Sequence, residues 1–393
     1  MPDSASAQAE CVIDLDAIAH NVRTLCNYAS GAAVMAVVKA DGYNHGALPV
    51  AVTALSAGAR EIGVATITEA LRLRMAGIRA PILCWLNAID SDYTAAIDAD
   101  IEIGVSSSRQ LQAIGAAAQA AGKMATVSVK VDTGLHRNGA SLQEYPRLLD
   151  ALQRLVRQRI IHFRGVFSHL ASADTPSDPL NDLQRQRFLD AISVAKTHGL
   201  HPEIAHLANS AATLTRSDLH FDMVRPGIAV YGLAPVAGDF PLIPAMTLQA
   251  RVTLVKKIAA GEGVSYGHDW VAPRDTAVAL LPVGYADGLP RALGGKFEVT
   301  IGGSRYTGVG RVCMDQVVVD LGADGSNIQE GDTAVFFGSG WHGECGAQDW
   351  ADSLGTIHYE VVAGPRGRVS RHYIGGETAS RVSEHKRQST DAP

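Results

Sequence analysis

Between residues 33 and 232, short apolar runs alternate with longer segments whose apolar residues recur at the helical period. AVMAVVK at 33–39 is typical of the first kind and ITEALRLRMAGI of the second. The pattern predicts eight strands, at 33–39, 61–66, 81–86, 101–106, 125–132, 163–169, 203–208 and 222–232. Eight strands with intervening helices favour an eight-stranded α/β (TIM-like) barrel, with a doubly wound open sheet as the alternative.

The pattern changes after the P-L-I-P segment at 241–244. Beyond it, β-like runs such as FEVTIGG and QVVVDL follow one another with turn residues between them, and helical periodicity becomes rare. We therefore expect an α/β barrel at 11–240 and a mostly antiparallel β domain at 241–382. The polar ends, 1–10 and 383–393, are expected to be flexible.

Composition narrows the class of protein. Apolar residues make up 47% and charged residues 19%, which is typical of a globular chain, and the net charge of -6 argues against a nucleic-acid-binding surface. No segment has the length of apolar sequence that a membrane span needs, and the first ten residues do not resemble a signal peptide. The five cysteines form no C-x-x-C pair, so a reducing, cytoplasmic location is expected.

Polar or aromatic side chains follow most of the predicted strands. Because barrel enzymes build their sites at the carboxyl ends of the strands, these side chains are expected to share one end of the barrel. Any one of them alone is more often structural than catalytic. The residues at or just beyond the strand ends are Lys39, Tyr43, Trp85, Lys130, Arg137, His169, Asn209, Ser210, Arg225 and Tyr231.

Several kinds of chemistry are poorly supported. The 14 histidines form no H-E-x-x-H or H-x-H motif, and no nucleophilic serine is predicted. The segment GSGWHG at 338–343 matches G-x-G-x-x-G, but no helix or βαβ unit surrounds it, so we expect a loop. No metal site is predicted.

Lys39 suggests a more specific chemistry, because it ends an apolar run. A partly desolvated amine has a lowered pKa, and its neutral form condenses with an aldehyde to give a Schiff base. If the aldehyde is pyridoxal 5'-phosphate, the site also needs a phosphate cradle, a partner for the ring nitrogen and a stacking surface. N-S-A-A at 209–212 and R-P-G-I at 225–228 can supply a cradle, His169 a stacking surface and Arg225 the partner.

These residues lie in motifs that resemble the bacterial alanine racemases. The first motif that carries the resemblance is A-V-V-K-A-D-G-Y-N-H-G at 36–46. The resemblance as a whole covers the chain, in order, from about residue 11 to residue 375. Further segments that carry it are V-K-V-D-T-G-L-H-R, F-S-H-L-A, H-L-A-N-S-A-A, D-M-V-R-P-G-I-A-V-Y-G, V-S-Y-G, L-P-V-G-Y-A-D-G, V-G-R-V-C-M-D-Q and G-T-I-H-Y-E.

The resemblance implies a barrel followed by a β domain, in a head-to-tail homodimer whose two sites each use both chains. Lys39 would hold pyridoxal 5'-phosphate, and Tyr266 of the partner chain would face it across the cofactor. The other implied cofactor contacts are Tyr43, Trp85, His169, Asn209, Ser210, Arg225, Gly227, Ile228 and Tyr359. The implied substrate contacts are Arg137 and the N–H of Met314, supported by Lys130, which family members often carry as a carbamate, and by Tyr285, Cys313 and Asp315.

A two-base racemisation of alanine fits these roles. One base removes the Cα proton from one face and the other returns a proton to the opposite face, so Lys39 and Tyr266 suffice. A phenol has an ordinary pKa near 10, so Tyr266 would need cationic or hydrogen-bonding neighbours. Arg225 stays protonated, which would leave the pyridine nitrogen neutral and make the ring a poorer electron sink.

The attachment motif departs from the family's usual A-D-A-Y-G-H-G at two positions, Gly42 and Asn44. Asn tolerates the left-handed backbone conformation better than most residues, so the turn can persist. A broad-specificity or serine racemase on the same scaffold is the main alternative activity, and a cofactor-binding protein without turnover is another. The C-M-D turn at 313–315 and Tyr359 favour alanine, used for peptidoglycan precursors or in alanine catabolism.

Overall fold

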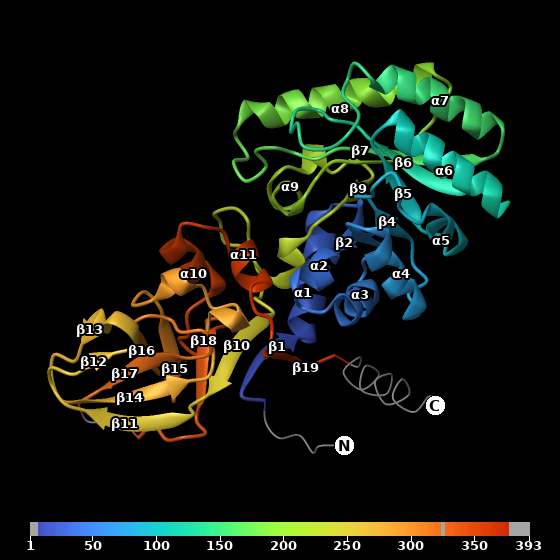
Figure 1. Cartoon of the computed structure of the whole chain (residues 1–393). Helices are drawn as coiled ribbons and strands as arrows, with labels where there is room; N and C mark the ends of the chain where they lie inside the picture. The colour runs from blue at the N-terminus through green and yellow to red at the C-terminus, as the bar shows by residue number, and fades with distance from the viewer. Residues whose placement is uncertain (1–6, 324–326, 377–393) are drawn as a thin grey trace, which may run out of the picture. The chain divides into compact units, whose positions relative to one another are not determined.

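The computed structural model describes residues 7–323 and 327–376, which form two compact units. The barrel unit comprises residues 18–42 and 46–242, and the sheet unit comprises Met1–Ala17, Tyr43–His45 and Ile243–Pro393. Figure 1 shows the helices and strands of both units by label. Each unit has its own apolar core, and each is described separately below.

The barrel unit is a closed barrel of eight parallel strands. Its strands are β2 (Ala33–Val37), β3 (Glu61–Val64), β4 (Ile82–Cys84), β5 (Glu102–Val105), β6 (Ala125–Lys130), β7 (Ile161–Phe167), β8 (Ile204–His206) and β9 (Met223–Val224). All residues of β3, β4 and β5 are buried, as expected for parallel strands covered by helices on the outside and packed side chains on the inside. The predicted barrel is therefore confirmed.

Seven of the eight observed strands are shorter than predicted, most of all the eighth, whereas β7 has the predicted length but begins two residues earlier. The predicted strand at 222–232 holds two strand residues and then a 3-10 helix, η2 (Ile228–Tyr231). Pro226 has no N–H for a ladder, and Gly227 takes φ -109° and ψ -86°, away from the extended region. The R-P-G segment thus turns the chain directly at the end of the barrel where the candidate site residues gather.

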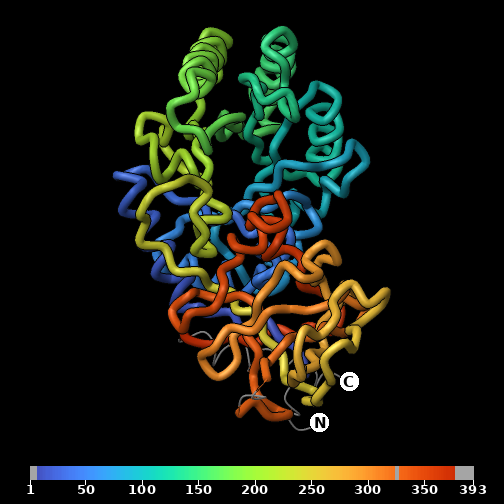
Figure 2. Tube along the Cα trace, turned by 90° about the vertical axis from the view of Figure 1, so that its left-hand side faces the viewer, coloured from blue at the N-terminus to red at the C-terminus, as the bar shows by residue number. Residues whose placement is uncertain are grey.

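Helices follow the barrel strands and cover them from outside. They are α1 (Leu15–Tyr28), α3 (Ala47–Ser56), α4 (Ile67–Met75), α5 (Tyr93–Asp98), α6 (Ser108–Ala121), α7 (Tyr145–Arg157), α8 (Pro179–Thr197) and α9 (Ser210–Thr215), with the 3-10 helix η1 (Ser217–Leu219). Helices α7 and α8 contact each other, and they lie next to each other in both views (Figures 1 and 2). In the described part of the chain, no helix has the length and apolarity needed to cross a membrane.

The sheet unit is built on one nine-stranded, mostly antiparallel sheet, as predicted. Its order is β11 (Leu254–Ile258), β14 (Thr276–Leu281), β17 (Val317–Gly322), β16 (Ser304–Val309), β15 (Glu298–Ile301), β18 (Thr333–Phe337), β10 (Met246–Arg251), β1 (Ala9–Asp14) and β19 (Ser370–Ile374). A hairpin of β12 (Gly263–Val264) and β13 (Trp270–Val271), helices α10 (Ala347–Leu354) and α11 (His358–Ala363), and the 3-10 helices η3 (Tyr266–His268), η4 (Tyr285–Asp287) and η5 (Arg291–Leu293) complete it.

Both ends of the chain contribute to this sheet. Strand β1 pairs antiparallel with β10 and parallel with β19. Of the segments expected to be flexible, 1–6 and 383–393 lie outside the described residues, whereas residues 9 and 10 belong to β1. The segment at 338–343 is a loop, as predicted, and the Glu344 carboxylate accepts the N–H groups of Gly340 and His342 within it.

A buried ion triad crosses the interior of the barrel. Arg164 of β7 pairs with Glu61 of β3 and Glu102 of β5, and Ser128 of β6 donates to Glu102. The carboxylate side chains are 7% and 4% exposed, so water solvates them poorly. Burial raises the pKa of Glu102, and the Arg164 guanidinium opposes that rise. These ion pairs and the Ser128 hydrogen bond link four strands, β3, β5, β6 and β7.

Replacing Arg164 with leucine is expected to lower the free energy of unfolding by about 3–5 kcal/mol, because two buried carboxylates lose their cation. Urea denaturation at neutral pH measures the change. Adding Glu61→Gln and Glu102→Gln to the Arg164→Leu chain should recover much of the loss, since the uncompensated charges are then removed. A loss of about 1 kcal/mol or less, as for exposed pairs, would contradict a buried triad.

Candidate active site at the carboxyl end of the barrel

Lys39 directly follows β2 and opens a left-handed turn. The five residues after it have positive φ, from 50° to 69°, and Ala40 and Asp41 have ψ near that of a left-handed helix. Each non-glycine residue in this conformation costs roughly 1–2 kcal/mol. Strain of this size persists only where the surrounding structure holds it, and it gathers at functional sites.

Specific contacts hold the turn on the barrel side. Glu69 of α4 accepts the N–H of Ala40 at 2.7 Å with one oxygen and caps its own helix with the other. The Asp41 carboxylate accepts the N–H of Ala47 at 2.9 Å. A Cβ on Gly42 would lie 3.2 Å from the Ala47 nitrogen, a tight contact that glycine avoids. The turn therefore presents Lys39 from a fixed backbone.

The Lys39 amine is half-buried among other cations. Burial lowers its pKa, the Arg137 guanidinium lowers it further, and the Glu69 carboxylate opposes both. A lowered pKa increases the fraction of neutral amine near neutral pH, and only the neutral amine is a nucleophile or a base. The strand-end position thus has the electrostatic effect that the sequence suggested.

Lys130 ends β6 and is 6% exposed. Burial and the neighbouring Arg225, Arg137 and Lys39 charges lower its pKa to about 8. Arg137 lies in the loop after β6 and is itself exposed. The barrel unit therefore brings Lys39, Lys130, Arg137 and Arg225 close enough to act on one another electrostatically.

Arg225 is buried behind β9 and is held on several sides. Its guanidinium donates to the Ser168 carbonyl at 2.5 Å and to Nδ1 of His206 at 2.9 Å. Burial lowers its pKa to about 9, which still leaves it cationic at neutral pH. It lies over the Phe167 ring at 5.6 Å, and Lys130 lies over the same ring at 5.7 Å.

Two histidines near Arg225 are kept neutral. Burial lowers the pKa of His169 far below its ordinary value, and the surrounding cations add to this effect. Burial and the nearby arginine charges also lower the pKa of His206 far below its ordinary value. The His206 ring stacks on the Phe167 ring, with 5.1 Å between their centroids. A neutral His206 can accept the hydrogen bond from Arg225, whereas an imidazolium cannot.

Ser210 occupies the first position of α9, beside the backbone of the R-P-G-I segment. Its Oγ accepts the N–H of Gly227 at 2.8 Å and that of Ala229 at 3.3 Å. Asn209 is the N-cap and accepts the N–H of Ala212 at 3.1 Å. Because the Ser210 oxygen is occupied as an acceptor, its hydroxyl proton is left to donate to another acceptor.

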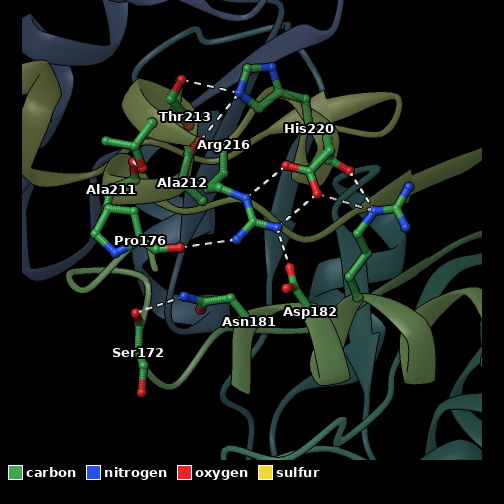
Figure 3. A network of polar contacts seen from close by, with 12 residues as sticks. Ser172, Pro176, Asn181, Asp182, Ala211, Ala212, Thr213, Arg216 and His220 are labelled. Carbon is green, nitrogen blue, oxygen red and sulfur yellow. Dashed lines mark hydrogen bonds and ion pairs between the residues drawn. The ribbon is translucent and has the colours of Figure 1, made fainter. Parts of the chain in front are cut away.

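A polar network anchors the far end of α9 (Figure 3). Arg216 follows the helix and donates to the Pro176 carbonyl at 3.0 Å and to Asp182 of α8 at 2.6 Å. Nε2 of the buried His220 ring lies 3.1 Å from the Thr213 carbonyl. The short helix, which could not be stable alone, is therefore fixed at both ends.

Trp85 lies just beyond β4, with its ring across β3. A Cβ on Gly63 would fall 2.8 Å from the indole, so the glycine makes room for the ring. The indole packs with a small apolar core of Met35, Leu83 and Met223. Trp85 is thus both partly exposed and part of the barrel packing.

In the sheet unit, Tyr43 and Tyr359 lie together. Their ring centroids are 6.2 Å apart, and the His358 ring stacks on Tyr359 at 5.1 Å. Burial raises the pKa of Tyr43, with a smaller contribution from Tyr359, so its phenol stays protonated and can donate. The two hydroxyl-bearing side chains come from sequence positions more than 300 residues apart.

Tyr266 is 70% exposed and follows a strained residue. Ser265 has φ 65° and ψ -171°, a region that is essentially restricted to glycine. Its Oγ donates to the Arg311 carbonyl at 2.9 Å and lies 3.2 Å from the Cys313 sulfur. The strained Ser265 thereby joins Tyr266 to the C-M-D turn.

The C-M-D turn packs against the Tyr285 segment. Tyr285 and the next residue donate N–H bonds to the carbonyls of Cys313 and Met314, at 3.0 and 2.9 Å. Arg368 pairs with Asp315 and with the buried Asp287. Within residues 7–323 and 327–376, the N–H of Met314 donates no hydrogen bond, and the residue is 53% exposed.

The predicted site residues therefore fall into two groups, one in each unit. The barrel unit holds Lys39, Trp85, Lys130, Arg137, His169, Asn209, Ser210, Arg225, Gly227 and Ile228. The sheet unit holds Tyr43, Tyr266, Tyr285, Cys313, Met314, Asp315 and Tyr359. Sequence reasoning did not assign roles to Glu69, His206 or Arg368. The T-I-T-E capping pattern could have indicated Glu69, and nothing in the sequence indicated Arg368.

Comparison with known proteins identifies the family. A model described as "Alanine racemase, N-terminal domain" matches residues 13–235, and one described as "Alanine racemase, C-terminal domain" matches residues 245–373. The alanine racemase of Mycobacterium avium (strain 104) is 58% identical over 367 residues, or 93% of this chain and 95% of that protein.

Solved structures agree. The crystal structure of alanine racemase from D-cycloserine-producing Streptomyces lavendulae has a TM-score of 0.92 and 44% identity, over 95% of this chain and 99% of that chain. Alanine racemase from Streptomyces coelicolor A3(2) has a TM-score of 0.91 and 44% identity, over 94% and 98%. Because these relatives are alanine racemases, the chain is an isomerase that acts on amino acids. The chain belongs to the alanine racemase family, which confirms the resemblance of its motifs.

Opposite charge changes near Lys39 should move its pKa in opposite directions. Arg137→Gln removes a repelling cation and is expected to raise the pKa of Lys39, whereas Glu69→Gln removes an attracting anion and should lower it. The pH dependence of Lys39 acetylation in the apoprotein, followed by peptide mass spectrometry, measures both. Arg72→Gln, an exposed change on the same helix as Glu69, serves as the control and should leave the profile in place. Shifts of the same sign for the first two variants would contradict this account.

Proposed function

We propose that the protein interconverts L-alanine and D-alanine with pyridoxal 5'-phosphate bound at Lys39, using Lys39 and Tyr266 of a partner subunit as the two bases. The observation that carries this proposal is that Lys39, Lys130, Arg137 and Arg225 lie close enough to act on one another electrostatically, which calls for an anionic ligand. A cofactor phosphate and a substrate carboxylate would supply the missing negative charge.

The residues present fit this cofactor. The Ser210 hydroxyl has its acceptor positions filled by two N–H groups, so its proton can serve a phosphate oxygen. Gly227 and Ile228 bring backbone beside it, and Tyr43 and Tyr359 add phenols that can donate. Arg225 can donate a hydrogen bond to a pyridine nitrogen, because its hydrogen bonds to the Ser168 carbonyl and to His206 fix its guanidinium.

When bound, pyridoxal 5'-phosphate supplies a conjugated ring that accepts the electrons left on Cα. Lys39 would exchange a proton with Cα from one side, and Tyr266 of the partner subunit would exchange one from the other. The lowered pKa of Lys39 suits it to the role of a base near neutral pH. Arg225 holds a positive charge where other enzymes of this cofactor use a carboxylate, which favours reprotonation over side reactions.

The substrate carboxylate would be held by Arg137 and by the N–H of Met314 of the partner subunit. Arg137 is exposed in the single chain, and Met314 has an N–H with no partner in the described chain. In this proposal Lys130 would orient Arg137, and a carbamate on Lys130 would turn a repelling neighbour into an attracting one. That change of sign would remove one of the unfavourable contacts among these cations.

A homodimer with shared sites would explain the exposure of Tyr266. A catalytic phenol that is 70% exposed on one chain would be poorly oriented and fully hydrated there. Met314, at 53% exposure, lies in the C-M-D turn, which the contact between Ser265 and Cys313 joins to the segment that carries Tyr266. A second copy of the chain that covers this surface would desolvate both residues.

We propose the cytoplasm as the location and a supply of D-alanine for peptidoglycan, or alanine catabolism, as the role. The five cysteines are all free thiols, which supports a reducing compartment. A broad-specificity or serine racemase is not favoured, because relatives that are 58% and 56% identical to the chain are alanine racemases.

Lys39→Ala should abolish racemisation and covalent attachment of the cofactor. The physical reason is that Lys39 supplies the amine with which the aldehyde condenses in this proposal. Borohydride reduction of the loaded protein, followed by peptide mass spectrometry, shows which lysine carries the label. A label that persists at another lysine with activity retained would defeat the assignment.

Tyr266→Phe should leave cofactor attachment intact and lower turnover by about 10²–10⁴-fold, the range for a lost general base. Because the remaining base lies on one face, loss of the Cα proton should slow more for one enantiomer than for the other. Exchange of the Cα hydrogen with deuterated solvent, followed from pure L-alanine and pure D-alanine, measures both rates. Equal slowing would argue against bases on opposite faces.

A further inference from the structure

Asn44 ends the left-handed turn after Lys39, and its side chain makes three hydrogen bonds within the sheet unit. Its Nδ2 donates to the Val362 carbonyl at 3.2 Å and to the Pro365 carbonyl at 2.7 Å. Its Oδ1 accepts a hydrogen bond from Arg371 of β19. A carboxamide has two N–H bonds and one oxygen, so all of its polar groups are used by these contacts.

These contacts connect Asn44 to the helix that carries Tyr359. Val362 is in the last turn of α11, where carbonyl groups have no N–H partner within the helix. Asn44 supplies such a partner and so caps α11 from outside. Tyr359 lies in the same short helix, and Tyr43 is the residue directly before Asn44. The carboxamide therefore sits at the junction between the two segments that bring these tyrosines to 6.2 Å.

We propose that Asn44 is a positioning residue for the binding of the cofactor phosphate. Its side chain holds the Tyr43 and Tyr359 phenols together as a pair. The inference rests on the proposed function, in which both phenols contact that phosphate. Asn44 itself touches neither the cofactor nor the substrate in this account. It acts by fixing the tip of the left-handed turn to the end of α11.

Backbone tolerance alone does not explain asparagine at this position. Asn44 has φ 69°, which glycine adopts with less strain than any other residue. A chain that needed only the turn would gain from glycine here. What asparagine adds is the set of donors to Val362 and Pro365 and the acceptor for Arg371.

Two variants separate the side chain from the backbone. Asn44→Gly keeps the left-handed conformation and removes all three contacts. Asn44→Asp keeps the shape and the acceptor for Arg371, but it removes both donors and places carboxylate oxygens against two carbonyls. Both variants should bind pyridoxal 5'-phosphate about tenfold more weakly as apoproteins, since a few hydrogen bonds of positioning are lost. Their affinity for pyridoxal, which has no phosphate, should stay at the wild-type value.

The ratio of the two affinities decides the question. Asn27→Gly serves as the matched control, because it weakens the end of α1 without touching the tyrosine pair, and its ratio should equal the wild-type ratio. Full pyridoxal phosphate affinity in Asn44→Gly, or equal losses for both ligands, would overturn the proposal. If wild-type apoprotein binds neither ligand, the proposed function itself fails, which is a different outcome. Should Asn44→Gly not fold, the ratio measured on Asn44→Asp decides alone.

Discussion

The burial of Lys39 among other cations is the constraint on which the site depends. Burial and the Arg137 guanidinium lower the pKa of the Lys39 amine, and the charges of Arg225, Arg137 and Lys39 in turn lower the pKa of Lys130. The same arrangement is unfavourable for the protein alone, because like charges with too few carboxylates oppose one another. Other contacts of the barrel unit stabilise this arrangement of cations. They are the hydrogen bond from the Ala40 N–H to Glu69, the hydrogen bond from Arg225 to the Ser168 carbonyl, and the ion triad across the barrel interior. An anionic ligand bound among these cations would replace their mutual repulsion with attraction to the ligand.

The sheet unit presents two of the predicted site residues, Tyr266 and Met314, on its surface. Tyr266 and Met314 are exposed, and they lie on two segments that a hydrogen-bonding contact of the strained Ser265 joins. The rigidity comes from Ser265, Cys313 and the Arg368 ion pairs. We infer that the barrel supplies the amine and the anion site, and that another copy supplies the phenol and the second carboxylate contact. Such a division would make the enzyme's activity depend on association.

The sequence predicted the barrel, the antiparallel sheet and the residues at the strand ends, because apolar periodicity and turn residues are local signals. It could not predict that residues 9–14 pair with β10 and β19, since that pairing joins positions more than 200 residues apart. The eighth strand was predicted too long, because its apolar run continues through a proline–glycine turn into a 3-10 helix. Lys39, Ser210 and Arg225 were recognisable from motifs, whereas the contacts of Asn44 and Arg368 depend on the folded sheet unit.

Mixing two inactive variants tests the central claim most directly. Lys39→Ala retains Tyr266, and Tyr266→Phe retains Lys39, so a mixed dimer with shared sites contains one complete site and one site lacking both bases. If subunits exchange at random, half of the dimers are mixed, and the mixture should recover about a quarter of wild-type racemase activity. Activity that stays at the level of the separate variants, while mass spectrometry shows that mixed dimers have formed, would contradict a site built from two chains.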